Sequence, residues 1–354
     1  MKKVKAVRKF RDRDFIQTKE GFFFCVTGPF HPSDRVISYL KYVPAKLGVW
    51  GRGKKRFKRV MRTYTIPSLL ETFSILRRNH PHYLFCSPFY NIKMTAVPHT
   101  YIAKHFKPEE KLAQLLSAKR LDSLQKKLVR FTSFLAKTSK TPLNVFGVTG
   151  SILLNIHRPE FSDLDITVYG LKNSLAVKNA LTAEYSLSNP AVQHFREDLL
   201  NAWCKAKTRN YPLTLNEALE IYERKWNVGL FENTRFSIHP VKLEHELAEE
   251  YGDKIYYPIG NVNVRAVVFE NTEGMFLPAI YHVRDVNVVE GPPVADIEEV
   301  VSYESLYDNL AEVGEDINVR GKLERVLETK TGREYHRVLV GSPEGKGMEY
   351  IKLD

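Results

Sequence analysis

The stretch FGVTGSILLNIHRPEFSDLDITVYG, residues 146–170, poses a problem at the centre of this 354-residue chain. An apolar strand runs into a Gly-Ser pair, a short helix follows, and a second strand begins with Asp163 and Asp165. Side chains two positions apart on a strand point to the same face, so the two carboxylates should lie close together. Two like charges at that spacing in a half-buried strand are costly unless a cation compensates them.

A divalent metal ion is one cation that would compensate this charge. Carboxylate oxygens are ligands of hard ions, and no cysteine or paired-histidine motif lies nearby. We therefore expect Mg²⁺ or Mn²⁺ at Asp163 and Asp165. The alternative is a dry pair of ion bridges to Arg or Lys, since the chain has 53 such residues.

Gly150 and Ser151 stand where the first strand gives way to the short helix. A helix N-terminus offers unpaired N–H groups, glycine lets a phosphate approach the backbone, and the serine hydroxyl adds a donor. A triphosphate bound there, beside a carboxylate-bound metal, is the arrangement that nucleotidyl transfer requires. Each half alone has an ordinary structural interpretation, as a loop glycine or a solvated strand end. Their order, with twelve positions from Ser151 to Asp163, favours the nucleotide site.

This combination resembles the DNA polymerase beta nucleotidyltransferase superfamily, whose pattern is a strand, Gly-Ser or Gly-Gly, a helix, and Asp-x-Asp or Asp-x-Glu on the next strand. GVTGS at 147–151 and SDLDITVYG at 162–170 carry the resemblance. More narrowly, the chain is similar to archaeal predicted nucleotidyltransferases, an impression also carried by TKEGFFFCVTG at 18–28 and RFSIHPV at 235–241. The resemblance implies an α+β fold with a mixed sheet and helices, phosphate binding by Gly150 and Ser151, and metal binding by Asp163 and Asp165.

One part of the superfamily pattern is missing. These enzymes usually carry a third carboxylate on a later antiparallel strand, and the strand TRFSIHPVK at 234–242 offers Ser237 and His239 but no acid. His239 could act as the catalytic base near neutral pH. The other interpretations are an acid from elsewhere, a structural histidine, or an impaired site. Just upstream, Lys225 is a candidate for binding the triphosphate, or it lies on a solvated helix end.

The regions on either side of this core differ in character. We expect a mixed α/β region over residues 1–105, the nucleotidyltransferase core over 106–245, and a β-rich C-terminal domain over 246–354, forming a small antiparallel sheet or barrel. Within the core, the apolar spacing predicts one long helix over 108–139. Near the C-terminus, two strands are expected to form a hairpin that turns at 330–332.

The charge balance indicates a polyanionic partner. The formal net charge is +12, and between Lys41 and Arg62 the chain has nine Lys or Arg residues and no acid. Tyr42, Trp50 and Phe57 are interleaved with these cations, which is typical of a nucleic-acid contact, although a solvated hairpin has the same composition.

The function hypothesis is a metal-dependent transfer of a nucleoside monophosphate from a nucleoside triphosphate to a hydroxyl. RNA, rather than DNA, is the favoured acceptor, and a small molecule or a protein side chain is the alternative acceptor. The alternative is a protein that keeps the fold without turnover and acts as a nucleic-acid-binding or regulatory factor.

The remaining composition indicates the compartment. The three cysteines match no zinc or redox spacing and leave one unpaired in any disulfide scheme. No apolar run approaches the length needed to span a bilayer. We therefore expect a cytoplasmic protein with no membrane partner.

Overall fold

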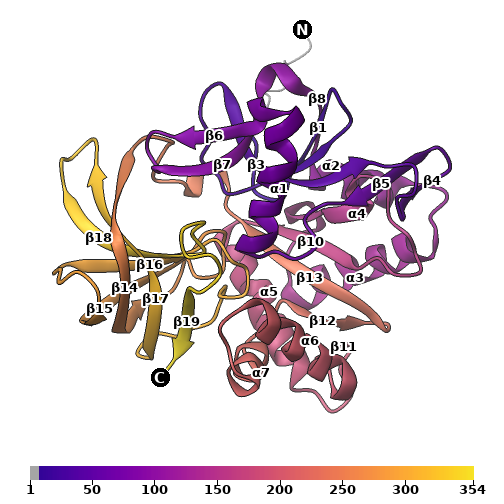
Figure 1. The fold of residues 1–354 in the computed structure, drawn as a ribbon. Coiled ribbons are helices and arrows are strands. Elements are labelled where there is room, and N and C mark those ends of the chain that lie inside the picture. Colours follow the sequence, from indigo (N-terminus) through magenta and orange to yellow (C-terminus); the bar gives the residue numbers. More distant parts are fainter. Residues whose placement is uncertain (1–7) are drawn as a thin grey trace, which may run out of the picture.

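The computed structural model describes residues 8–354, which form three β-sheets and seven α-helices (Figure 1). This mixed composition agrees with the expected α+β class. The sheets lie within residues 15–106, 146–241 and 254–353; the predicted boundary after residue 245 lies between two sheets, and the one after residue 105 lies one residue before the end of the N-terminal sheet. Over the described part of the chain, every helix is too short or too polar to cross a membrane.

The N-terminal sheet has the strand order β4-β5-β3-β2-β1-β8, and β7 joins it through β3 and also pairs with β6. Its strands are β1 (Phe15–Thr18), β2 (Phe23–Val26), β3 (Arg35–Pro44), β4 (Trp50–Arg52), β5 (Lys55–Arg59), β6 (Leu84–Ser87), β7 (Ile92–Pro98) and β8 (Ile102–Phe106). Helix α1 (Ile66–Asn79) packs on one face through Leu76, and the other face packs Phe15 and Tyr42 against residues 153–156 of the next unit. The basic segment forms the β4–β5 hairpin, which projects from the right-hand edge of the molecule in Figure 1.

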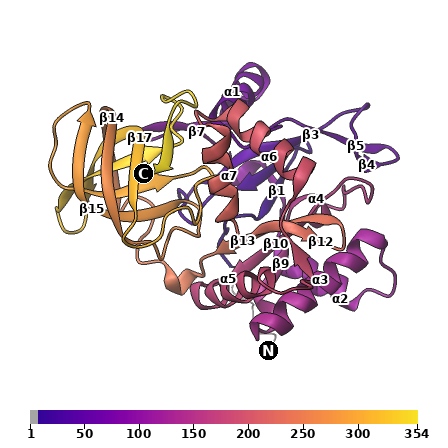
Figure 2. The same ribbon diagram turned by 90° about the horizontal axis from the view of Figure 1, so that it is seen from below.

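The central sheet has the order β11-β12-β13-β10-β9. Its strands are β9 (Phe146–Val148), β10 (Leu164–Tyr169), β11 (Val192–Gln193), β12 (Val228–Phe231) and β13 (Thr234–Val241), and its helices are α2 (Pro108–Ser117), α3 (Ser123–Ser139), α4 (Gly150–Leu153), α5 (Leu171–Tyr185), α6 (Glu197–Asn210) and α7 (Leu215–Glu223). Side chains of α2, α3 and α5 form one core with β9, β10 and β13, so these helices cover one face of the sheet (Figure 2).

The alternation of side chains along β10 explains why a buried strand can begin with two aspartates on one face. Leu164 and Ile166 are fully buried in the core beneath the helices. Asp163 and Asp165 therefore point to the opposite face, which looks toward the N-terminal sheet. On this opposite face Thr167 and Tyr169 are buried, and only the start of the strand, with Asp163 and Asp165, is open to solvent.

Strand β13 lies beside β10 with Ser237 opposite Asp165 and His239 two positions further along. The two strands run parallel. On its other side β13 pairs antiparallel with β12. Strand β12 immediately precedes β13, and the tight β12–β13 hairpin sets the direction in which β13 then runs alongside β10.

The predicted single helix over 108–139 is also wrong, because α2 ends at Ser117 and α3 begins at Ser123. Asp122 stops the run: its Oδ1 accepts from the Gln125 N–H at 3.0 Å, and the Gln125 side chain accepts from the Asp122 N–H at 3.1 Å. Such a capping box favours a new helix start over continuation of the previous helix. The apolar spacing continues across the break, which is why it suggested one helix.

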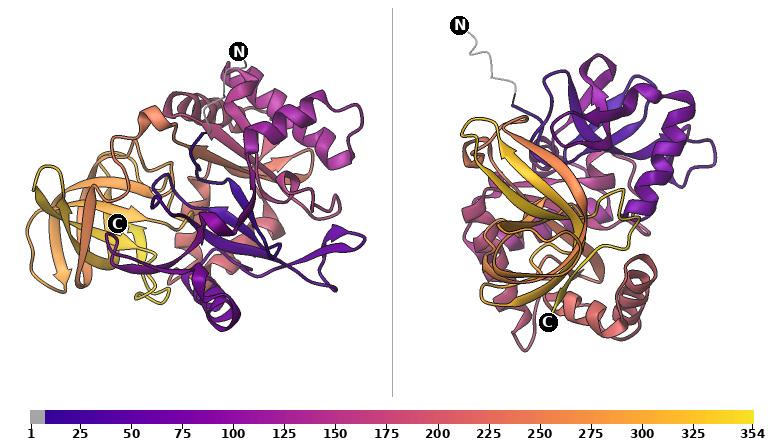
Figure 3. Two further views of the ribbon diagram at one scale, coloured as in Figure 1. Left: turned by 90° about the horizontal axis from the view of Figure 1, so that it is seen from above. Right: turned by 60° about the vertical axis from the view of Figure 1, so that its left-hand side comes forward.

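The C-terminal sheet closes into a barrel, seen from another side in the right-hand view of Figure 3. Its strands are β14 (Lys254–Glu270), β15 (Ala279–Glu290), β16 (Ile297–Ser302), β17 (Asp316–Glu328), β18 (Glu334–Val340) and β19 (Tyr350–Leu353). The sheet closes because β14 pairs with both β15 and β17, and β16 and β18 form a parallel pair within it. The β17–β18 hairpin turns through residues 330–332 as predicted. The ring order β14-β15-β16-β18-β17 is that of a five-stranded Greek-key barrel of the OB type.

Candidate functional site

A cavity of about 300 Å³ lies between the N-terminal and central sheets. It brings together all the residues that the sequence pointed to: Asp163, Asp165, Gly150, Ser151, His239 and Lys225 all line its wall. The N-terminal sheet contributes Lys41 and Arg59 to the same wall, and the barrel contributes Asp308. The site is thus built from all three parts of the chain.

Gly150 touches the second carboxylate. Its φ is +65°, and a Cβ added there would lie 2.1 Å from Asp165 Oδ2, so only glycine fits this position. The Thr149 N–H also donates to the Asp165 carbonyl at 3.0 Å. Helix α4 is only one turn long, so its dipole is small. Phosphate binding here would depend on local N–H groups and the Ser151 hydroxyl.

A hydrogen-bond chain on β13 holds Asp165 in place. Ser237 Oγ donates to Asp165 Oδ1 at 2.7 Å, and His239 Nε2 lies 2.9 Å from the same Oγ. Because the serine proton points to the carboxylate, the histidine donates from Nε2. Burial, with the charges of Arg13 and Lys41, holds the pKa of His239 well below its usual value, so the ring is neutral. This geometry makes His239 a positioning group for Asp165.

Asp163 retains contact with solvent, but its neighbours disfavour its charge. Desolvation by the cavity walls and the charge of Asp165 raise the pKa of the Asp163 carboxyl to about 6, against the attraction of Arg235 and Arg59. The two carboxylates therefore repel each other, as their spacing indicated.

The alternative of a dry ion bridge can be checked against the cations of the cavity. Arg13 pairs with Asp12, and Lys225 pairs with Asp308. Over residues 8–354, no Lys or Arg nitrogen lies within 4 Å of an Asp163 or Asp165 carboxylate oxygen. Oxygen donors without a cationic partner fit a hard divalent ion.

Two cations in the cavity were not found from the sequence. Lys41 on β3 and Arg59 on β5 lie on paired strands, and neither has an acidic partner within 4 Å in the described chain. The Tyr64 ring lies 5.2 Å from Lys41 Nζ and 5.1 Å from the Arg59 guanidinium carbon. Aromatic contact stabilises a cation without neutralising it. Their positive charge is therefore available to an anionic ligand.

Lys225 lines the cavity, but its ammonium group already has partners. Nζ donates to the Asp308 carbonyl at 2.7 Å, to the Ser305 carbonyl at 3.2 Å and to the Asp308 carboxylate. These acceptors belong to the loop between β16 and β17, so the contact joins the central sheet to the barrel. Binding of a phosphate by Lys225 would require it to exchange these partners. Asp308 is a third acid of the cavity, and no strand pattern marked it in the sequence.

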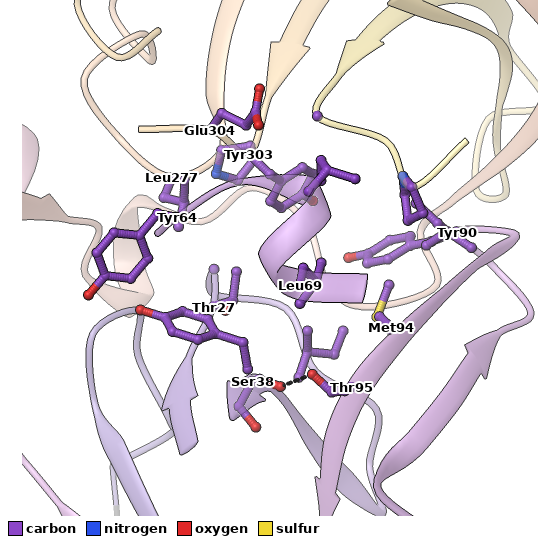
Figure 4. A pocket seen from close by; sticks show the side chains of 18 of the residues that line it. Thr27, Ser38, Tyr64, Leu69, Tyr90, Met94, Thr95, Leu277, Tyr303 and Glu304 are labelled. Atoms are coloured by element: carbon purple, nitrogen blue, oxygen red, sulfur yellow. Dashed lines mark hydrogen bonds between the residues drawn. The ribbon is translucent and has the colours of Figure 1, made fainter. Parts of the chain in front are cut away.

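A second cavity of about 190 Å³ adjoins the first, and the two share Arg13, Tyr64 and Ser305 in their walls. Figure 4 shows it between helix α1, the N-terminal sheet and the barrel. Its lining is mainly apolar and aromatic, with Leu69, Met94, Leu277, Tyr90 and Tyr303 among its members. Burial and the nearby Glu349 raise the pKa of Glu304 in this wall to about 8, so its carboxyl is mostly neutral at pH 7. Such a cavity suits an organic group beside the charged site.

The contact between Gly150 and Asp165 gives a first prediction. Gly150→Ala should destabilise the protein by about 1–2 kcal/mol through its positive φ, and should also displace the Asp165 carboxylate and weaken Mg²⁺ binding. Gly332→Ala is the matched control, because Gly332 has φ +72° with nothing within 4 Å. Denaturant unfolding and Mg²⁺ titration would compare the two. Equal Mg²⁺ affinity in both variants would contradict the assigned contact.

The raised pKa of Asp163 gives a second prediction, on pH. A carboxyl with a pKa of about 6 is largely protonated at pH 5, where a carboxyl with an ordinary value stays ionised. Mg²⁺ affinity should therefore fall about tenfold between pH 7.5 and pH 5. The measurement is isothermal titration at several pH values, with Asp163→Asn as control, since this variant should lose both most of the affinity and the pH step. A flat profile in the wild type would show that Asp163 does not take part.

Comparisons with known proteins yield one relative to report. The chain is 29% identical to the uncharacterized protein MJ1086 of the archaeon Methanocaldococcus jannaschii, over 98% of this chain and 99% of that protein. No protein-family model and no solved structure matches. The chain is therefore similar, over its full length, to an archaeal protein whose printed name states no activity.

Proposed function

We propose that this protein is a metal-dependent nucleotidyltransferase that moves a nucleoside monophosphate from a nucleoside triphosphate to a hydroxyl group. One observation carries the proposal. Two carboxylates that have no cationic partner within residues 8–354 share a cavity with a Gly-Ser turn that touches one of them, and Lys41 and Arg59 line the same cavity. This neighbourhood of carboxylates, turn and cations supports the proposal that a metal ion and a triphosphate bind side by side.

The residues have separate roles in this reaction. Asp163 and Asp165 would hold Mg²⁺ or Mn²⁺, which when bound supplies charge neutralisation for the leaving pyrophosphate and activation of the attacking hydroxyl. Ser151 and the N–H groups beside it bind phosphate oxygens, and Lys41 and Arg59 offset the triphosphate charge. The acceptor oxygen bonds to the α-phosphorus as the bond to the β-phosphate oxygen breaks. Ser237 and His239 keep Asp165 oriented throughout.

We propose RNA as the acceptor, on the strength of the β4–β5 hairpin and its flanks. Exposed cations surround it: Lys46, Arg52, Lys54, Lys55, Arg56, Lys58 and Arg62. Trp50 of this hairpin also lines the cavity and lies edge-on to Tyr42 and Phe161. An RNA strand bound by the cations of the hairpin would therefore lead to the cavity of Asp163 and Asp165. Such a surface binds a phosphate backbone by releasing counterions. The OB-type order of the barrel is a further analogy to nucleic-acid binders.

The second candidate function is binding without turnover. Two observations favour it. The residue opposite Asp165 is Ser237, whereas enzymes of the superfamily usually have a third acid on this strand. The other acid of the cavity, Asp308, is already paired with Lys225. A protein with this cavity could then bind nucleotide or RNA as a regulatory factor.

A label-transfer assay separates the two candidates. The full chain is incubated with Mg²⁺, total RNA and each α-³²P-labelled nucleoside triphosphate in turn, and the RNA is resolved on a gel. We expect label on RNA, and loss of at least 100-fold in rate with Asp165→Asn, because the variant removes one of the two charges that hold the metal. Asp34→Asn is the control, since Asp34 lies outside the cavity and pairs with Arg35.

Two results of this assay would count against the proposal. RNA binding in the absence of any transfer would favour the regulatory candidate. Transfer that survives Asp165→Asn unchanged would show that the chemistry lies elsewhere.

The unpaired cations give a further prediction. Lys41→Ala and Arg59→Ala should each weaken binding of Mg²⁺–triphosphate by about 10- to 100-fold, because hydrogen bonds to charged groups contribute about 1.5–3 kcal/mol. Lys58→Ala is the matched control, as Lys58 neighbours Arg59 on β5 but is exposed and does not line the cavity. Equilibrium binding of a non-hydrolysable triphosphate measures the effect. Similar losses in all three variants would indicate only a general charge effect.

A further inference from the structure

We propose that Glu20, His80 and His82 form a binding site for a divalent transition metal, with Zn²⁺ as the expected ion. Glu20 lies in the turn between β1 and β2, His80 directly follows helix α1, and His82 is in the 3-10 turn Pro81–Tyr83. The ligand atoms of the three side chains all lie within 4.8 Å of one another. Two imidazoles and one carboxylate are a donor set that zinc takes in proteins, with water in a fourth position.

The ring of His82 supplies an independent observation. Its Nε2 is shielded from water and has no hydrogen-bond partner within residues 8–354. The facing atom, Glu20 Oε1, is 3.9 Å away, which is too long for a hydrogen bond. A buried nitrogen left in this state is costly, and such atoms call for an explanation. A metal ion between the two atoms would satisfy both.

The spacing agrees with this explanation. Zinc bonds of about 2.0–2.2 Å at a tetrahedral angle place two ligand atoms about 3.4 Å apart. The observed 3.9 Å between His82 Nε2 and Glu20 Oε1 therefore needs a closure of only about half an ångström. A gap that excludes water still admits an ion of much smaller radius.

Neighbouring side chains already hold two of the three ligands, Glu20 and His82, in orientation. The Tyr83 hydroxyl donates to Glu20 Oε2 at 2.6 Å, which fixes the carboxylate. The His82 ring stacks on Tyr101 with centroids 4.1 Å apart and an interplanar angle of 18°. Outer contacts of this kind orient metal ligands and tune their affinity.

The site would fasten three separate segments of the N-terminal unit together. It joins the β1–β2 turn, the end of α1 and the short turn that leads into β6. None of its three ligands lines the cavity of Asp163 and Asp165. The inference is therefore independent of the proposed nucleotidyl transfer, and either can fail alone.

Metal titration of the full, tag-free chain tests this proposal. The protein carries Asp163→Asn and Asp165→Asn, so that the carboxylate pair does not contribute, and is first stripped with chelator. Titrated Zn²⁺ should bind with 1:1 stoichiometry, Co²⁺ should give the visible absorption bands of a tetrahedral N/O site, and Zn²⁺ at 100 times its Kd should raise Tm by roughly 4 °C.

Variants assign the ligands. His82→Ala should weaken Zn²⁺ binding at least tenfold and abolish the Co²⁺ bands, whereas His245→Ala, which alters an exposed histidine outside the cluster, should change neither. Tyr83→Phe removes only the hydroxyl that orients Glu20 and should weaken binding about tenfold. If His82→Ala does not fold, Zn²⁺ binding can still be tested with this milder variant. Absence of Zn²⁺ binding at 100 µM metal, or binding unaffected by both His82→Ala and Tyr83→Phe, would overturn the proposal.

Discussion

The repulsion between Asp163 and Asp165 is the constraint around which the centre of this protein is arranged. Their strand is buried beneath helices on one face, so the spacing of two places both charges together on the other. Gly150 packs against Asp165 at a position where no other residue fits, and Ser237 binds it from the neighbouring strand. The chain thus holds one carboxylate of an unfavourable charge pair in place, and structural conflicts of this kind tend to mark functional sites.

The three sheets contribute different chemistry to the cavity. The central sheet supplies the carboxylates and the Gly-Ser turn, and the N-terminal sheet supplies Lys41 and Arg59. The barrel supplies Asp308, whose carboxylate forms an ion pair with Lys225. Lys41 and Arg59 contact the Tyr64 ring, and Asp165 accepts a hydrogen bond from the Ser237 hydroxyl, so the cations and the carboxylate line the same cavity without pairing with each other. This separation leaves positive charge for a polyphosphate and negative charge for a metal ion, and the adjoining apolar cavity offers room for an organic group.

The parts of this account that the sequence predicted are the local ones. The alternation along β10 and the turn at Gly150 depend only on residues that are close in the sequence. The hairpin at 330–332 likewise joins two strands that are separated by few residues. Lys41 and Arg59 could not be distinguished from the other seven cations of residues 41–62. Which of these side chains point into the cavity depends on the pairing of β3 with β5 and on packing against the central sheet, which is distant in the sequence. Asp308 lies in an irregular loop without periodicity. The pairing of β13 with β10 depends on the course of helices α5 to α7 and strand β12 between them, which no short sequence pattern records.

The central claim is that a metal ion and a polyphosphate meet at Asp163, Asp165 and the Gly150–Ser151 turn. Its most direct test is a crystal structure with Mn²⁺ and a non-hydrolysable nucleoside triphosphate, using anomalous scattering to locate the metal. The account predicts an anomalous peak about 2.1 Å from oxygens of both carboxylates, with phosphate oxygens on the turn and near Lys41 and Arg59. It would be contradicted by carboxylates that bind Arg or Lys side chains in the crystal, or by a triphosphate that binds away from this turn.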